Sequence, residues 1–136
     1  IIDLKKNINN KINNYRDIFK SKDDYFIKKW PINSSIRAWY VKLQSQGYQK
    51  PHIHPSAWLS GVFYLRIPNF LKNNEGSIKL TLDGYNFPKN ETLPNKIHSP
   101  KDFDIILFPS SLFHRTIPFI SDFGRFVIPF DFNPEL

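Results

Sequence analysis

The sequence predicts a mainly-β domain with one helix at its N-terminus. Apolar residues recur at steps of three and four from Ile1 to Phe19, which is the period of an amphipathic helix. Beyond them, short runs of β-branched and aromatic residues alternate with turn residues. Many short strands at this spacing form a barrel or a sandwich. The expected strands cover residues 36–44, 57–67, 77–82, 104–108, 114–120 and 124–132.

The length of the chain fits one domain. Of its 136 residues, 40% are hydrophobic, which is enough apolar material for a packed core and argues against disorder. We expect residues 1–30 to form the N-terminal helix and the segment that leads into the strands. Residues 31–136 are expected to form the β domain. The first residue is not Met, so we expect the chain to be a piece of a longer protein.

Composition limits the cellular compartments and the classes of binding partner that we expect for the chain. No run of about 18 apolar residues is present, so we expect no membrane span. Cysteine is absent, which permits a reducing compartment, and we expect a cytoplasmic protein. The net charge is +7, but the lysines and arginines are scattered and form no basic stripe. A solvated basic surface is therefore favoured over a nucleic-acid interface.

The histidines form the most informative pattern. The chain has four, and His52 and His54 flank one isoleucine just before a predicted strand. Residues two apart in an extended segment face the same way, so both imidazoles can point at one centre. A metal needs a third ligand, and His114, after the turn that follows strand 104–108, is the candidate. The alternative for the pair is a proline-flanked surface turn; His98 is expected to be solvated in a polar loop.

Arg125 opens a predicted strand whose neighbours are almost all apolar. An arginine there needs an anionic partner or a route to solvent, and a buried guanidinium is well suited to holding a carboxylate through two parallel hydrogen bonds. The alternative is a strand-end arginine whose head reaches water. The position after His114 favours binding of a co-substrate.

Three segments, in order, resemble one enzyme family. They are PHIHPSAWLSGVFYL (51–65), LFPSSLFH (107–114) and GRFVIPFDF (124–132). They are similar to motifs of the 2-oxoglutarate/Fe(II) oxygenases related to prolyl hydroxylases, which often follow tetratricopeptide repeats. The resemblance spans about residues 36–132. It implies a double-stranded β-helix, or jelly roll, and an enzyme that uses Fe(II) and the co-substrate 2-oxoglutarate to hydroxylate a protein or peptide side chain or a small molecule.

The resemblance also implies roles for individual residues. His52 and His114 would be iron ligands, and His54, which falls where the wider group carries Asp or Glu, would be the third. Arg125 would bind the far carboxylate of 2-oxoglutarate. Tyr64 matches a strand tyrosine that helps to hold the same carboxylate.

Two departures from the family pattern bear on activity. His54 in place of a carboxylate makes the centre more positive and weakens the electron push to iron. Val127 stands where many relatives carry Ser or Thr, so the carboxylate clamp has one hydroxyl fewer. Tyr64, or Ser60 on the same strand face, could compensate.

Two other functions stay open. A cupin also places H-x-H and a distal His on a jelly roll, and the string G-x4-H-x-H from Gly47 is close to a cupin motif. Cupins usually add a Glu after the pair, but residues 55–60 contain no acid. That absence and the presence of Arg125 favour the oxygenase. A catalytically inactive jelly roll that works as a binding module is the third possibility, because His54 replaces the carboxylate.

Overall fold

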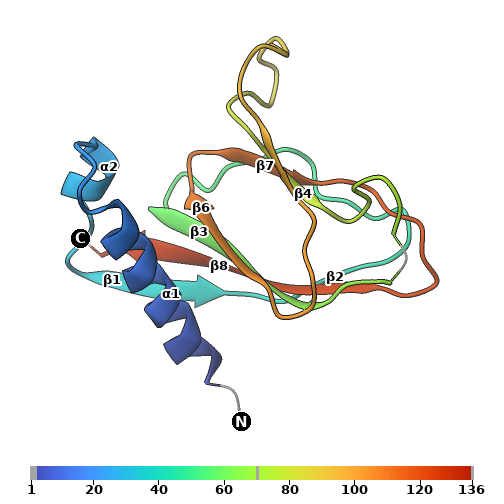
Figure 1. Cartoon of the computed structure of the whole chain (residues 1–136), viewed down its shortest axis with the longest axis horizontal. Coiled ribbons are helices and arrows are strands. Elements are labelled where there is room, and N and C mark those ends of the chain that lie inside the picture. The colour runs from blue at the N-terminus through green and yellow to red at the C-terminus, as the bar shows by residue number, and fades with distance from the viewer. Residues whose placement is uncertain (1–2, 70, 136) are drawn as a thin grey trace.

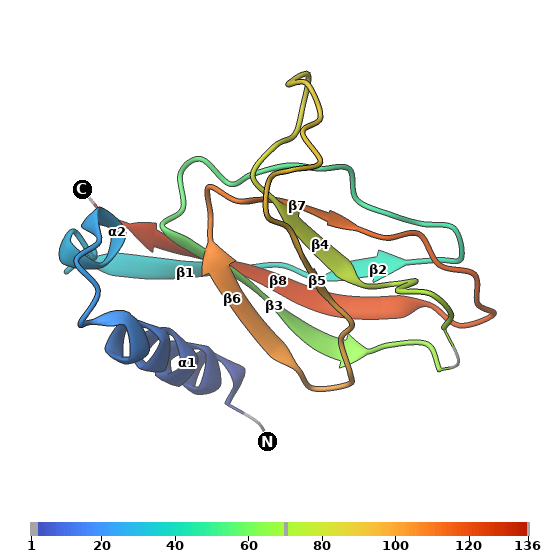
Figure 2. The same cartoon turned by 45° about the horizontal axis from the view of Figure 1, so that its top comes forward.

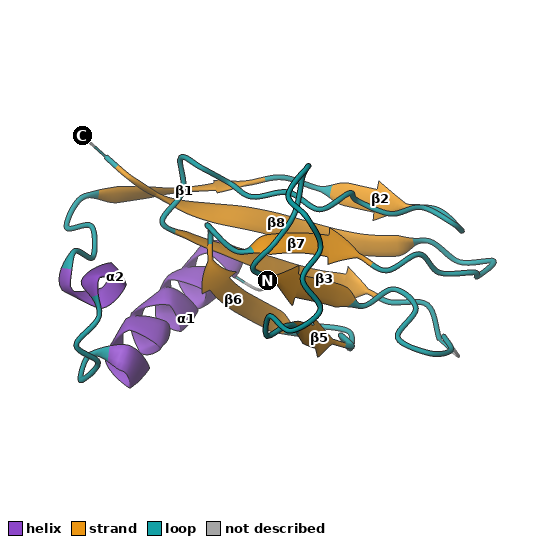
Figure 3. Cartoon of the chain, turned by 90° about the horizontal axis from the view of Figure 1, so that it is seen from above, coloured by secondary structure: helices purple, strands orange, loops and turns teal. Residues whose placement is uncertain are grey.

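The computed structural model describes residues 3–69 and 71–135, in which strands predominate and the helices lie at one end (Figures 1 and 3). The strand bounds follow in chain order. They are β1 Ser34–Ala38, β2 Val41–Leu43, β3 Leu59–Arg66, β4 Ile78–Thr81, β5 Lys96–His98, β6 Ile105–Pro109, β7 Phe113–Thr116 and β8 Arg125–Pro134.

Helices α1, Leu4–Phe19, and α2, Tyr25–Lys28, precede the strands. Each begins after an aspartate, Asp3 or Asp24, whose carboxylate accepts a hydrogen bond from a backbone N–H of the first turn. Helix α1 confirms the helix predicted from the apolar period, and Ile1 of that pattern lies outside the described residues. Among the described residues no helix is long and apolar enough to cross a bilayer.

The strands form two antiparallel sheets that face each other (Figure 1). The larger sheet has the order β1-β8-β3-β6, and β2 also pairs with β8. The smaller sheet has the order β5-β4-β7. The predicted mainly-β fold with an N-terminal helix is confirmed. The loop between β4 and β5 projects beyond the sheets at the top of Figure 1.

Strand β8 organises the larger sheet, because it pairs with β1, β2 and β3. Its register against β3 sets Asp131 opposite Ser60 and Val127 opposite Tyr64. Side chains alternate between the two faces of a strand, and the odd-numbered residues from 125 to 131 are all buried. This face of β8 looks toward the smaller sheet.

The larger sheet has a hydrophobic cluster on each face. On one face Ile8 and Ile12 of α1 pack with Leu59, Phe130 and Phe132, so the helix shares its core with the sheet (Figure 2). The other face joins the two sheets. Its cluster contains Val62, Tyr64, Ile78, Phe108 and Val127. The division of the chain after residue 30 stays a prediction.

Three details differ from the sequence prediction. The strand expected over 36–44 is broken at residues 39–40 into β1 and β2. The strand expected over 114–120 ends at Thr116, two residues before Pro118, whose missing N–H cannot join a ladder. His98 was expected in a polar loop but lies in β5, with Nε2 3.3 Å from Asp104 Oδ2.

The shared core predicts unequal effects of one substitution at two positions of α1. Ile12 is 2% exposed and Ile18 is 62% exposed. Ile12→Ala should lower the free energy of unfolding by about 2–4 kcal/mol, because it leaves a cavity against the sheet. Ile18→Ala, the matched control, should change it by no more than about 0.5 kcal/mol. Urea unfolding measures both, and equal effects would show that α1 does not pack as described.

Candidate metal centre

Backbone hydrogen bonds bring the three predicted histidines together. His52 and His54 lie in the extended segment between β2 and β3, and His114 lies in β7. His52 and His114 each donate their N–H to the carbonyl of the other, at 3.1 and 3.0 Å. The N–H of His54 donates to Ser110 O at 3.1 Å. The segment that carries His52 and His54 is thus hydrogen-bonded to β7, at the edge of the smaller sheet, and to Ser110 before it.

The imidazoles of these residues form one compact group. One ring nitrogen from each of His52, His54 and His114 lies within 4.8 Å of the others. His114 is buried, and the other two are half-buried. The ring centroids are 4.2 Å apart for His52 and His114, 5.0 Å for His54 and His114, and 5.2 Å for His52 and His54. Three nitrogen ligands at such separations suit a single transition-metal ion.

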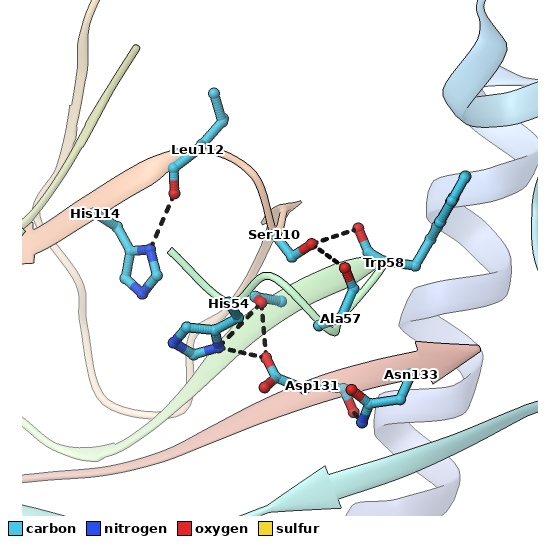
Figure 4. A network of polar contacts seen from close by, with 9 residues as sticks. His54, Ala57, Trp58, Ser110, Leu112, His114, Asp131 and Asn133 are labelled. Atoms are coloured by element: carbon cyan, nitrogen blue, oxygen red, sulfur yellow. Dashed lines mark hydrogen bonds and ion pairs between the residues drawn. The ribbon is translucent and has the colours of Figure 1, made fainter. Parts of the chain in front are cut away.

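Each of these imidazoles makes a hydrogen bond through Nδ1 to an oxygen atom of the protein. The Nδ1 of His52 lies 2.7 Å from Lys50 O, and that of His114 lies 3.2 Å from Leu112 O. The Nδ1 of His54 lies 2.6 Å from Asp131 Oδ1 (Figure 4). Carbonyl and carboxylate oxygens only accept, so each Nδ1 carries the proton. In the neutral ring Nε2 then keeps its lone pair, which is the form that binds a metal.

The environment of His114 keeps its ring neutral. The pKa of His114 is lowered from 6.5 to about 4, mainly by burial. The nearby imidazole of His52 also lowers this pKa, and its effect is larger than the opposite effect of the hydrogen bond to the Leu112 carbonyl. A neutral imidazole at neutral pH needs no proton removed before it can bind a cation.

Arg125 is a buried cation without an acidic partner. It is 2% exposed, and no carboxylate of the described residues lies within ion-pair distance of it. Its Nε donates to Gly76 O at 3.1 Å, and its guanidinium lies 5.2 Å from the ring centroid of Tyr64. Burial lowers the pKa of Arg125, but an arginine stays charged in proteins. A buried guanidinium of this kind can bind an anion.

Tyr64 lies against Arg125, and its hydroxyl has no hydrogen-bond partner among the described residues. Burial raises the pKa of Tyr64 to about 12, although the charge of Arg125 acts in the opposite direction. The phenol is therefore a neutral donor at physiological pH. Ser60, the other residue considered as a substitute for the hydroxyl missing at Val127, donates its own hydroxyl to Asp131 at 2.7 Å instead.

The three histidines and Arg125 line one small cavity between the sheets. Its volume is about 20 Å³, which holds a water molecule and little more. Tyr64 does not line this cavity, but its ring lies 5.2 Å from the guanidinium of Arg125, which does. Val62, Ile78, Phe108 and Val127 make its apolar sides. A dicarboxylate can enter only if the lining side chains move apart.

A larger groove adjoins this cavity. Its volume is about 680 Å³, and Arg115, which also lines the cavity, is part of its wall. Pro51 next to His52 and Arg115 next to His114 bound the groove on the side of the histidines. The β4–β5 loop supplies much of the rest, including the exposed aromatic rings of Tyr85 and Phe87.

Comparison with known families identifies the chain. The sequence model of a family described as "Putative 2OG-Fe(II) oxygenase" matches residues 37–131, which is most of the chain. The protein belongs to this oxygenase family. The resemblance read from the three motifs is thereby confirmed. No curated protein sequence matches the chain.

Solved structures support the fold of this chain. An oxidoreductase of the 2OG-Fe(II) oxygenase family from Burkholderia pseudomallei matches with a TM-score of 0.59 and 12% identity, over 79% of this chain and 46% of that one. HygX from Streptomyces hygroscopicus matches at 14% identity over 78% of this chain and 61% of its own, with TM-scores of 0.54 without metal and 0.55 with iron bound. The likeness confirms the predicted jelly roll, and this chain spans between about half and three-fifths of those proteins.

The cofactors that the family implies, Fe(II) and 2-oxoglutarate, agree with the chemistry of the residues present. Imidazole nitrogen is a suitable ligand for iron, and three rings here bring one nitrogen each within 4.8 Å of the others. A buried guanidinium is a suitable partner for a carboxylate, and in the part of the chain that the structure describes neither an acidic group for Arg125 nor a hydrogen-bond partner for the neighbouring tyrosine hydroxyl is found.

Sequence reasoning missed Asp131, whose carboxylate touches His54 and Ser60 (Figure 4). One signal was available, because Asp131 is the single acidic residue within the apolar run of β8. An acid at such a position is rarely buried unless it is paired. Its partner depends on the β3–β8 register, which the sequence does not display.

The lowered pKa of His114 predicts that the metal-free protein loses stability as the pH falls from about 6.5 to about 4. In that window the unfolded chain binds a proton at His114 and the folded chain does not, so the free energy of unfolding rises with pH. The full difference is roughly 3 kcal/mol. Urea unfolding with a chelator present, at half-unit steps of pH, measures it.

Two variants isolate the contribution of this ring to the pH dependence. His114→Gln should flatten the curve between pH 4 and 6.5. His98→Gln, which changes a histidine outside the cavity, should keep the wild-type slope. Parallel curves for the wild type and His114→Gln would contradict the predicted shift.

Proposed function

We propose that this chain is an Fe(II)- and 2-oxoglutarate-dependent dioxygenase that hydroxylates an unidentified substrate. One observation carries the proposal. Three imidazoles bring one ring nitrogen each within 4.8 Å of the others, in a cavity that also contains a buried arginine without an acidic partner among the described residues. A metal-binding group and an anion-binding group thus lie side by side, as a metal and a dicarboxylate co-substrate together require.

In this proposal His52, His54 and His114 hold the iron through Nε2. Each ring is fixed by its Nδ1 hydrogen bond, so little orientational freedom is lost when the metal binds. When bound, iron and 2-oxoglutarate would supply the chemistry by which O2 hydroxylates a C–H bond: one oxygen atom of O2 enters the substrate, the other enters succinate, and CO2 is released. No side chain of the chain is required as an acid or base in this scheme.

Arg125 binds the far carboxylate of 2-oxoglutarate and fixes the direction of the co-substrate. Two parallel N–H groups of a guanidinium match two carboxylate oxygens. Tyr64 lies beside it and can donate its unpartnered hydroxyl to the same carboxylate once the cavity widens. The apolar side chains of Val62, Phe108 and Val127 keep bulk water from the reacting centre.

The groove beside the cavity is the proposed route for the substrate. Its wall includes Pro51 and Arg115, which are the chain neighbours of the proposed ligands His52 and His114. Its size and its exposed aromatic rings accommodate a peptide side chain or a small molecule. A cytoplasmic location stays a prediction.

A second candidate function is a cupin-like three-histidine metal protein that does not use 2-oxoglutarate. It is favoured by the ligand set, because the group of ligand atoms contains three imidazoles and no carboxylate. A jelly roll that has lost catalysis and acts as a binding module is the remaining alternative. Binding of 2-oxoglutarate at Arg125 separates these functions from the oxygenase.

The decisive experiment is an anaerobic titration of the metal-free protein with Fe(II), with and without 2-oxoglutarate. We expect a weak visible charge-transfer band only when both are present. His114→Ala should abolish metal binding, because it removes one of three ligands. Arg125→Gln should keep the metal and lose the band. Arg66→Gln, which removes an exposed arginine from β3, should behave as the wild type.

Each outcome of that titration separates the candidates. Metal binding without a band in the wild type would favour the cupin-like protein. If neither metal nor 2-oxoglutarate binds, the chain is a binding module. A band that persists undiminished in Arg125→Gln would show that another group holds the co-substrate.

Tyr64→Phe tests the role of the unpartnered hydroxyl. The variant should leave the free energy of unfolding of the metal-free protein unchanged or slightly higher, because the hydroxyl has no partner to lose. The affinity of the iron-loaded protein for 2-oxoglutarate should fall about tenfold, the effect of one hydrogen bond to a charged group. Tyr40→Phe, at a tyrosine that is 57% exposed, is the control. Unchanged affinity in Tyr64→Phe would confine this tyrosine to packing.

A further inference from the structure

Asp131 is a buried carboxylate next to one of the proposed ligands. It is 9% exposed and lies in β8, directly opposite Ser60 of β3. Its Oδ1 lies 2.6 Å from His54 Nδ1 and accepts a hydrogen bond from Ser60 Oγ at 2.7 Å. Two elements that are distant in sequence therefore converge on a single oxygen atom.

No lysine or arginine accounts for this carboxylate. Among the described residues no Lys or Arg nitrogen lies within ion-pair distance of Asp131, and its close contact with a histidine nitrogen is the one to His54 Nδ1. Arg37 is its neighbour in register on β1, but that residue is exposed and makes no ion pair with it. A buried acid is costly unless a donor or a positive group faces it. The charge of Asp131 is thus directed at the ring of His54.

The three imidazoles are consequently not equivalent. His52 and His114 donate their Nδ1 protons to neutral backbone carbonyls, of Lys50 and Leu112. His54 alone donates to a carboxylate (Figure 4). A carboxylate behind an imidazole fixes the ring orientation and its tautomer and makes Nε2 a stronger donor to a metal. The ligand atoms themselves include no carboxylate, and Asp131 reaches the group only through its hydrogen bond with His54.

We propose that Asp131 is a positioning residue that supplies, through the ring of His54, the negative charge that a direct carboxylate ligand would give the metal. The inference rests on the proposed three-histidine metal centre. Ser60 holds the carboxylate in place from β3, which leaves one lone pair of Oδ1 directed at Nδ1 of His54. The proposed centre thus consists of three imidazole ligands and one carboxylate. The carboxylate does not bind the metal itself but is hydrogen-bonded to the imidazole of His54.

Co(II) is the probe for the test, because its visible absorption reports on the ligand field and it accepts the same nitrogen ligands as iron. Asp131→Asn keeps the shape of the side chain and removes the charge. We expect it to bind Co(II) about 10–100-fold more weakly, with a changed visible spectrum. Asp104→Asn, which alters the other His–Asp pair outside the cavity, should bind Co(II) as the wild type does.

The protonation of His54 gives a readout that needs no variant. In long-range ¹H–¹⁵N spectra of the metal-free wild type at neutral pH, we expect the proton of His54 on Nδ1. A proton on Nε2 instead would overturn the proposal, even if Asp131→Asn fails to fold.

The remaining outcomes are equally distinct. Co(II) affinity and spectrum unchanged in Asp131→Asn would reduce Asp131 to a structural role and overturn the inference while the metal centre stands. A wild type that does not bind Co(II) would overturn the three-histidine centre itself, and the inference with it.

Discussion

The antiparallel pairing of β8 with β3 is the constraint on which the site depends. That ladder, joined by the pairing of β3 with β6, forms the floor of the cavity. Because the register sets Asp131 opposite Ser60 and Val127 opposite Tyr64, one strand face carries an anion near one end and the cation of Arg125 at the other. The bridge between His52 and His114 then fixes the imidazoles over this floor from the smaller sheet. A shift of one residue in the register would turn Arg125 and Asp131 to the face that packs on α1.

The charges of the site are arranged for ligands. A guanidinium that is nearly inaccessible to water and has no acidic partner costs several kcal/mol relative to one in solvent. A carboxylate bound at Arg125 would recover part of that cost. The ring of His114 avoids a similar cost, because burial lowers its pKa and keeps this imidazole neutral at neutral pH. A group of three imidazoles next to a buried guanidinium that has no acidic partner among the described residues is therefore electrostatically suited to take up a metal ion and a dicarboxylate together.

Much of the fold could be predicted from the sequence, because strands and helix follow from local periodicity. The runs that became β3, β6 and β8 are apolar enough to be recognised without knowledge of their partners. His52, His54 and Arg125 could be found because polar residues at fixed spacing stand out beside apolar strands. Strand β5 could not, because its three residues have little strand character of their own and are held by pairing with β4.

Asp131 shows the same limit at the site, since its partner His54 lies 77 positions away and is reached only through the sheet register. Tyr64 lies next to Arg125 but not on the cavity wall, which depends on packing and not on sequence spacing.

The central claim is that one metal ion sits among three histidines, with a dicarboxylate held by Arg125. A crystal structure of the protein grown without oxygen in the presence of Mn(II) and 2-oxoglutarate tests it most directly, because anomalous scattering locates the metal. The account predicts one manganese ion bonded to Nε2 of His52, His54 and His114, and a 2-oxoglutarate carboxylate in contact with the guanidinium of Arg125. A metal bound elsewhere, or a 2-oxoglutarate that leaves Arg125 without an anion, would contradict it.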